Sequence, residues 1–272
     1  MKKNFKLFIL LFVALVVVSN CTKAPITNRT QLKIVDEEKT VLEGKKAYRD
    51  YINDMAAEKL LLNNTSDGIR LRKIGNKITT AVEKYMNENG MSEKIKDLEW
   101  EINLVKSDQV NAWAIAGGKI AFYSGIMPVL KTDAGIAFVM GHEIGHVIGG
   151  HHAEGASQRQ LGNILIIGKN VADILTNGAV SGTIGSQTLE KGVVLGLKKF
   201  SRTNEYEADR YGMIFMAMAG YDPSESIAVW ERMTEKSGNR TFTLLDSHPG
   251  NEDRIKRMKK NLPEAMKYYK PN

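Results

Sequence analysis

The chain has 272 residues, of which 43% are hydrophobic and 25% charged, proportions that exclude global disorder and a polytopic membrane protein. The formal net charge is +7, and the basic residues are spread along the chain, so no nucleic-acid partner is expected. At this length we expect one full-sized domain with short appendages.

The N-terminus has the layout of a secretory signal. Three lysines within the first six residues precede an unbroken apolar run over residues 7–18. Twelve apolar residues are too few to span a bilayer comfortably. We therefore expect residues 1–20 to be a signal peptide, which leaves a net charge of +4 from 35 basic and 31 acidic residues.

Cys21 is the only cysteine of the chain. It stands where a bacterial lipobox places its lipid-modified cysteine, although Asn20 occupies a position that usually holds Gly, Ala or Ser. Residues 21–35 are polar and contain Pro25, so they are expected to be a lipid anchor and tether. This predicts an extracytoplasmic protein held by lipid on Cys21 at the bacterial envelope, on the inner or outer membrane; an uncleaved signal anchor and a secreted form are the alternatives.

The remaining sequence, residues 36–272, predicts a single, mainly helical α+β domain. Residues 98–105 and 110–124 favour β-strands and are broken by Gly117-Gly118, a hairpin signal that predicts a small antiparallel sheet. Residues 155–198 are rich in Gly, Ala, Ser and Ile, and we expect helices with a loose connection there, a mobile lid being the alternative. Helices are expected over residues 36–63, 66–86, 132–153, 201–219, 223–236 and 250–261.

The helix expected over residues 132–153, with Thr132 or Asp133 as its N-cap, carries the segment His142-Glu143-Ile144-Gly145-His146. Positions i and i+4 place both imidazoles on one helix face, where they can chelate one zinc ion. Glu143 then lies beside the metal, where it can take a proton from water that the cation activates and pass it to a leaving amine. The segment predicts a zinc peptidase with Glu143 as its base.

A catalytic zinc needs a third protein ligand, and two candidates compete. His152 would complete the metzincin spacing, with Gly149 turning the chain, but that class places a methionine turn beneath the site and the first downstream methionine is Met213. The second candidate is Glu205. By itself, a glutamate in an acidic helix is usually a solvated surface residue, so the residues alone leave the choice open.

Several separate segments resemble the HtpX and CAAX prenyl protease family of gluzincins, and the resemblance covers residues 36–272. These segments are Asn111-Ala112-Trp113-Ala114 followed by Gly117-Gly118, the His142 to His146 motif, the run from Glu205 to Arg210, and His248-Pro249 with Arg254. The resemblance implies a zincin-like fold with one zinc per chain, a sheet beside the motif helix, and Glu205 as the third ligand. It also implies that Asp209 orients a ligand histidine, with which its i+4 position relative to Glu205 agrees; Glu207 is expected to point elsewhere.

The same resemblance suggests roles for residues outside the metal ligands. His248 and Arg254 are expected to stabilise the oxyanion of the tetrahedral intermediate. Alternatives are that His248 simply ends a loop, or that it occupies the open zinc position in a resting state.

Residues 111–116 are expected to be an edge strand that an extended substrate joins through main-chain hydrogen bonds. Asn111, Ala112 and Ala114 would be the substrate-binding residues, with Asn111 holding the substrate backbone. Trp113 is expected to pack in the core. We expect His151 and His152 to be structural or exposed residues and not ligands.

The leading hypothesis is a zinc endopeptidase, of the short single-domain periplasmic lipoprotein type, that cleaves misfolded or unassembled envelope proteins. Its partners would be unfolded or flexible polypeptides and, through Cys21, a membrane. The alternatives are a zinc-stabilised chaperone or assembly factor with minor or latched catalysis, and a secreted metzincin with His152 as third ligand.

Overall fold

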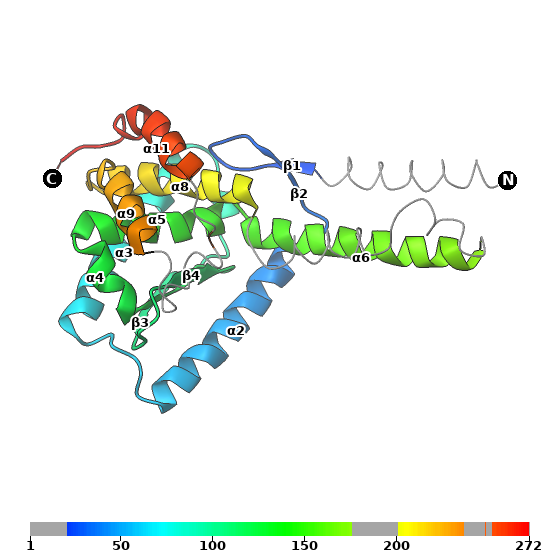
Figure 1. Cartoon of the computed structure of the whole chain (residues 1–272), viewed down its shortest axis with the longest axis horizontal. Helices are drawn as coiled ribbons and strands as arrows, with labels where there is room; N and C mark the ends of the chain where they lie inside the picture. The colour runs from blue at the N-terminus through cyan, green and yellow to red at the C-terminus, as the bar shows by residue number, and fades with distance from the viewer. Residues whose placement is uncertain (1–20, 176–200, 237–247, 249–251, 272) are drawn as a thin grey trace. The chain divides into compact units, whose positions relative to one another are not determined.

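The computed structural model describes residues 21–175, 201–236, 248 and 252–271 (Figure 1). The expected signal peptide and most of the glycine-rich part of residues 155–198 lie outside the described residues. The elements are, in chain order, β1 (Cys21–Lys23), β2 (Thr30–Leu32), α2 (Glu37–Ala57), α3 (Ser66–Glu88), β3 (Glu101–Val105), β4 (Ala112–Ile115), β5 (Lys119–Tyr123), α4 (Met127–Leu130), α5 (Asp133–Ile148), α6 (His151–Leu175), α8 (Arg202–Met218), α9 (Glu225–Lys236) and α11 (Glu252–Ala265).

The chain divides into two compact units, and the single domain expected over residues 36–272 stays a prediction. In the described part of the chain, the first unit consists of residues 21–39 and 153–175, and the second of residues 40–152, 201–236, 248 and 252–271. None of the helices in the described part of the chain combines the length and apolar character needed to span a bilayer.

Residues 21–32 of the first unit form a hairpin, and the anchoring role of residues 21–35 stays a prediction. Strands β1 and β2 pair antiparallel. Arg29 donates to both carboxylate oxygens of Glu154 at 2.8 and 2.7 Å, and the hydroxyl of Ser157 accepts the backbone N–H groups of Ile34 and Val35. These long-range bonds join the hairpin and the segment after it to helix α6, which composition alone does not reveal.

A three-stranded sheet in the second unit has the order β3-β5-β4. Strands β4 and β5 form the predicted antiparallel hairpin, and β3 joins β5 in parallel. Gly117 and Gly118 make the turn with φ of 97° and 83°, values that glycine adopts at little cost. The prediction of a mainly helical fold with a small sheet beside the motif helix is confirmed.

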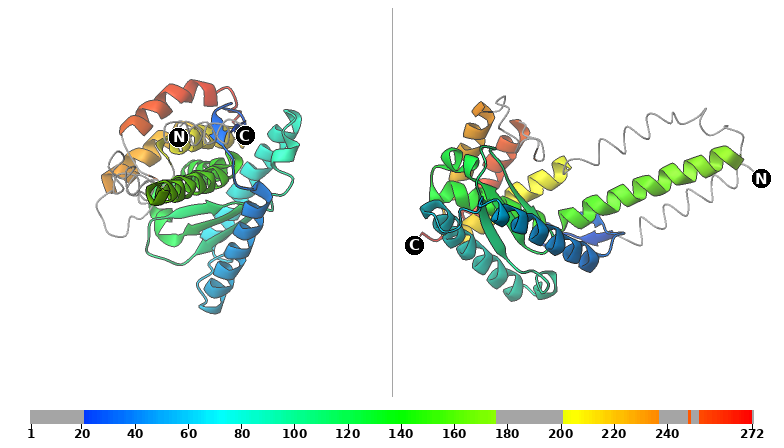
Figure 2. Two further views of the ribbon diagram at one scale, coloured as in Figure 1. Left: turned by 90° about the vertical axis from the view of Figure 1, so that its right-hand side faces the viewer. Right: turned by 90° about the horizontal axis from the view of Figure 1, so that it is seen from below.

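Helix α5 is the centre of the second unit and is apolar on almost every side, as expected for a buried helix. Thr132 is its N-cap, and its side chain accepts the N–H of Gly135 at 2.9 Å. The helix ends at Ile148, five residues earlier than predicted, because Gly150 adopts a φ of +65° and breaks the continuation before α6 begins. Helix α5 runs between strand β4 and helix α8, with α3 also packed against it (Figure 2).

Glycines allow α5 and α8 to approach closely. A Cβ atom on Gly212 would lie 2.9 Å from the backbone nitrogen of His142, and one on Gly141 would lie 2.8 Å from the carbonyl oxygen of Gly212. Both distances are too short for a carbon contact. The two helices therefore pack backbone against backbone at the level of His142, which brings the side chains of α8 within reach of the motif.

Candidate metal centre

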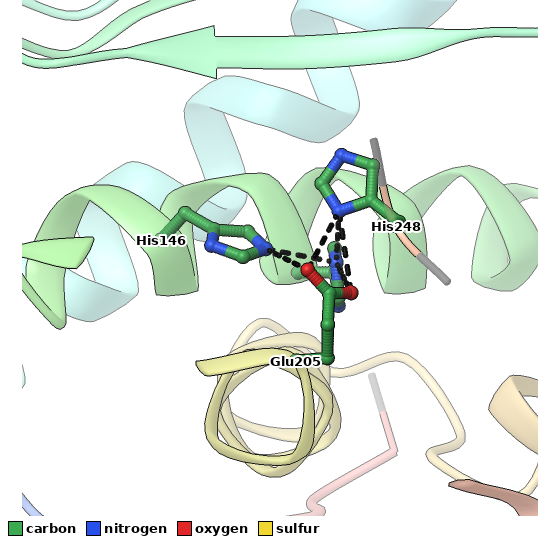
Figure 3. Close-up of side chains that lie close together, drawn as sticks. His146, Glu205 and His248 are labelled. Atoms are coloured by element: carbon green, nitrogen blue, oxygen red, sulfur yellow. Dashed lines mark hydrogen bonds and ion pairs between the residues drawn. The ribbon is translucent and has the colours of Figure 1, made fainter. Parts of the chain in front are cut away.

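Four buried side chains converge between α5, α8 and the segment that precedes α11. The residues are His142, His146, Glu205 and His248, and one ligand atom from each lies within 4.8 Å of the others. Figure 3 shows His146 on α5 and Glu205 on α8 pointing toward one another, with His248 beside them. Two imidazoles and a carboxylate from the protein form the donor set that a catalytic zinc uses.

The two motif histidines present their Nε2 atoms to the same point. These atoms are 3.2 Å apart, and Glu205 Oε2 and Oε1 lie 3.6 Å from His142 and 3.5 Å from His146. His152, the competing candidate ligand, lies outside this group, because its Nε2 contacts the carbonyl oxygen of Ala114 at 3.0 Å. The geometry thus brings Glu205, and not His152, to the motif.

Glu205 reaches the site because it lies in the first turn of α8. Ser201 caps this helix by accepting the N–H of Asn204, whose side chain in turn accepts the N–H of Ser201. Glu205 is only 1% exposed, whereas an acidic helix predicts a solvated position. Burial would raise the pKa of Glu205, but the neighbouring charges of His248 and Arg254 outweigh burial and hold that pKa below its usual value.

Behind the site, Asp209 and Arg254 form a buried ion pair. Arg254 Nε and Nη2 donate to the two carboxylate oxygens of Asp209 at 2.7 and 2.6 Å, and Nη1 donates to Glu205 Oε2 at 2.7 Å. Asp209 Oδ1 also lies 3.0 Å from His142 Nδ1. Although burial opposes ionisation, Arg254 and His142 keep the pKa of Asp209 well below its usual range.

This geometry does not fit the expectation that Arg254 stabilises the oxyanion. Each of its three side-chain nitrogens donates to Glu205 or Asp209, and the guanidinium stacks over the ring of Trp230 at 3.8 Å. Arg254 therefore faces the rear of the carboxylates and holds them in place.

Glu143 points toward strand β4 and the front of the group. Its Oε2 accepts the N–H of Ala114 at 3.0 Å, and its Oε1 lies 3.5 Å from His248 Nε2. Burial raises the pKa of Glu143 above the usual carboxylate value, despite the opposing effect of His248 and His142. The position beside the two histidines is the one that a general base requires.

His248 lies among the other three side chains of the group, closer to His142 and Glu205 than a residue that only donates to an oxyanion would be. Its Nδ1 is 3.3 Å from His142 Nε2 and 3.2 Å from Glu205 Oε1. His248 is thus within the group of side chains that could hold a metal ion, and both of its expected roles stay predictions.

Strand β4 lies along the front of the site. The N–H of Tyr123 donates to the carbonyl oxygen of Asn111, so by alternation the backbone groups of Ala112 and Ala114 face away from β5. At Ala114 these groups bind Glu143 and His152. Trp113 packs edge-on against Tyr48 and Tyr51 of α2 and is half-buried.

The structure also brings in two residues that sequence reasoning set aside. His151 Nδ1 lies 2.9 Å from His146 Nδ1, and His151 Nε2 lies 3.0 Å from Glu207 Oε2. All three side chains are buried. The short spacings from His146 to His151 and from Glu205 to Glu207 are a signal in the sequence, and Gly149-Gly150 marks a helix end. The inward direction in which His151 then turns is not visible there.

Paired histidines on one buried helix, a glutamate from a second helix and a carboxylate beside them define a metallopeptidase-type site. Comparison with known proteins agrees, because residues 75–262 match the model of peptidase family M48. The chain belongs to peptidase family M48. The narrower resemblance to HtpX and CAAX prenyl proteases stays a prediction, and zinc is the cofactor that the family and the donor set together indicate.

Individual relatives come from mitochondria and bacteria. The chain is 31% identical to the mitochondrial metalloendopeptidase OMA1 of Schizosaccharomyces pombe over 70% of its own length and 53% of that protein. It is 29% identical to metalloprotease LoiP of Escherichia coli over 64% of its length and 67% of that protein. It is 28% identical to the beta-barrel assembly-enhancing protease of Yersinia pestis over 56% of its length and 32% of that protein. The chain thus spans about half of the fission-yeast relative and a third of the Yersinia one.

Proposed function

We propose that the chain is a zinc endopeptidase in which His142, His146 and Glu205 hold the ion. The observation that carries the proposal is the convergence of these three buried side chains from two helices, with Glu143 beside them. When bound, zinc supplies a Lewis acid that lowers the pKa of water and polarises a peptide carbonyl.

In this proposal Glu143 moves the proton. Its carboxylate takes a proton from the attacking water and delivers it to the nitrogen of the leaving amine. Burial raises the pKa of Glu143. The raised pKa is closer to the value at which one side chain can both accept a proton from water and donate it to the amine. The N–H of Ala114 holds one carboxylate oxygen, so that the other can act.

The substrate is proposed to lie along β4 as an added strand. A peptide paired with this edge meets the backbone groups of Ala112 and Ala114, and at Ala114 it competes with Glu143 and His152. Asn111 is proposed to hold the substrate backbone. In support, its side-chain oxygen is a buried acceptor that receives no hydrogen bond from the described residues.

For His248 we propose the role of a fourth ligand in a resting state, which must leave before a peptide carbonyl can enter. Its contacts with His142, Glu205 and Glu143 support this role. Arg254 is proposed to position Glu205 and Asp209, and Asp209 to orient His142.

In the cell, we propose that the enzyme is anchored through lipid on Cys21 and cleaves misfolded or unassembled envelope proteins. Cys21 is exposed at the start of the described chain. The name of the Yersinia relative, a beta-barrel assembly-enhancing protease, supports an envelope role. Recognition through the backbone of β4 would favour unfolded or flexible segments, because main-chain pairing ignores most side chains.

The test is cleavage of casein by the zinc-loaded protein and by Glu143→Gln. We expect this variant to bind zinc normally and to lose activity by about 10²–10⁴-fold, since general acid-base catalysis contributes that much. Glu93→Gln is the matched control, because Glu93 is an exposed glutamate with a side chain that is 84% exposed. Equal activity in Glu143→Gln and the wild type would overturn the assignment of the base.

The position of His248 also favours a second candidate, an assembly factor with latched catalysis. A deletion strain complemented with Glu143→Gln separates the two. Full rescue by a variant without casein cleavage would show that proteolysis is not the cellular role, whereas failure to rescue supports the protease.

A further inference from the structure

We propose that His151 and Glu207 are positioning residues that fix the tautomer and ring orientation of His146, and thereby strengthen zinc binding. The inference rests on the proposed metal site and adds two residues to it. Neither residue belongs to the group of four convergent side chains.

The contacts fix the direction of each hydrogen bond. If His146 binds the metal through Nε2, its proton must be on Nδ1, and that proton points at His151 Nδ1, 2.9 Å away. His151 Nδ1 must then be an acceptor, so the proton of His151 is on Nε2, 3.0 Å from Glu207 Oε2. With both imidazoles neutral and Glu207 ionised, only one arrangement of protons satisfies both contacts. It leaves the lone pair of His146 on Nε2, the atom that faces His142 and Glu205.

Because these side chains are buried, losing one of the two hydrogen bonds should affect His146. His146 and His151 are 0% exposed and Glu207 is 5% exposed, so water cannot readily replace a lost partner. The other oxygen of Glu207 lies 3.5 Å from the hydroxyl of Tyr211. Glu207 is thus held on α8 in the orientation that receives His151.

The backbone leaves room for the His151 ring. A Cβ atom on Gly149 would lie 2.5 Å from His151 Nε2, which no side chain tolerates without displacing the imidazole. Because Gly149 has an ordinary helical φ of −67°, the reason for glycine here is space and not backbone conformation.

The two ligand histidines are therefore held by different means from the same helix. Asp209 lies directly behind His142, whereas Glu207 acts on His146 through the imidazole of His151. Residues two apart on a helix point about 200° apart. This explains how Glu207 faces away from the metal and still acts on a ligand.

The test measures zinc affinity by competition with a chromophoric chelator in wild type, His151→Leu and His151→Asn. Loss of a partner that orients a ligand typically weakens metal binding about 10–100-fold, and we expect that loss in His151→Leu. The asparagine side chain places an amide oxygen near the position of the imidazole Nδ1, so His151→Asn should recover most of the affinity. In the cobalt-substituted protein, the visible absorption bands should shift in His151→Leu and return toward the wild-type bands in His151→Asn.

Tyr48→Phe is the control for general destabilisation, because Tyr48 is a buried side chain whose hydroxyl donates to the carbonyl oxygen of Ile120, on the sheet. It should lower stability without changing zinc affinity. If His151→Leu does not fold, Glu207→Gln, which keeps the shape of the side chain and removes its charge, should weaken zinc binding in the same direction.

Different outcomes separate the two proposals. If the wild type binds no zinc, or Glu205→Ala keeps full affinity, the proposed metal site fails. If those two proteins behave as proposed while His151→Leu or Glu207→Gln keeps wild-type affinity and cobalt bands, only the role of His151 and Glu207 is wrong.

Discussion

At the scale of single residues, the site contains several buried charged side chains. Glu205 and Asp209 are both almost fully buried, and Arg254 is the buried cation that donates to both. Burial raises the free energy of each charged group unless a partner compensates it. The carboxylates that face the histidines therefore depend on a cation behind them before any metal is present.

Replacing Arg254 by Gln should destabilise the metal-free protein by about 3–5 kcal/mol, because removal of one partner leaves buried charges uncompensated. Urea unfolding of the chelator-treated protein measures this loss. Arg210→Gln is the matched control, since its ion pair with Glu264 is partly exposed and should contribute about 1 kcal/mol or less. Unchanged stability together with a large fall in kcat would instead favour the oxyanion role that the sequence suggested.

At the scale of elements, the approach of α5 and α8 determines whether the site forms. The glycines at positions 141 and 212 allow the backbones to touch beside His142. The distance between the helices in turn sets the distance from Glu205 to both histidines.

Gly212→Ala should separate the helices. Overpacking of this kind costs about 1–3 kcal/mol, and the displaced Glu205 should bind zinc more weakly. Thermal unfolding and chelator competition measure the two effects. Gly155→Ala is the control, because among the described residues a Cβ there meets only the flexible end of Arg159 at 3.6 Å; it should be neutral or slightly stabilising. Equal behaviour of the two variants would show that the close contact does not matter.

Some of these elements can be predicted from the sequence, and others cannot. Helix α5 and the β4–β5 hairpin follow from local signals, namely the spacing of His142 and His146 and the glycine pair at 117 and 118. The rest depends on contacts between distant segments. The contacts of Arg254 with Glu205 and Asp209 join segments that are far apart in the sequence. The glycine pair at positions 149 and 150 marks a helix end but does not show that His151 turns against His146.

At the scale of the whole molecule, the proposed zinc site would act as a cross-link between α5 and α8. The chain has a single cysteine, so no disulfide within one chain can connect α5 to α8. Glu205 is 59 positions after His146 in the sequence. An ion held by both residues should stabilise the fold, because it closes the loop between them.

Chelation should therefore lower the Tm. A ligand that binds only the folded state at 1,000 times its Kd adds about 4 kcal/mol to the free energy of unfolding. Differential scanning calorimetry with and without added zinc measures the shift. In Glu205→Ala the addition of zinc should change the Tm much less; a shift as large as that of the wild type would mean that Glu205 does not hold the ion.

The central claim is that zinc is held between two helices by His142, His146 and Glu205. Metal analysis of the purified wild type, Glu205→Ala and His152→Ala after dialysis tests it most directly. We predict one zinc per chain in the wild type and in His152→Ala, and a substoichiometric amount in Glu205→Ala. Retention of zinc by Glu205→Ala together with its loss from His152→Ala would contradict the account and assign the third ligand to His152.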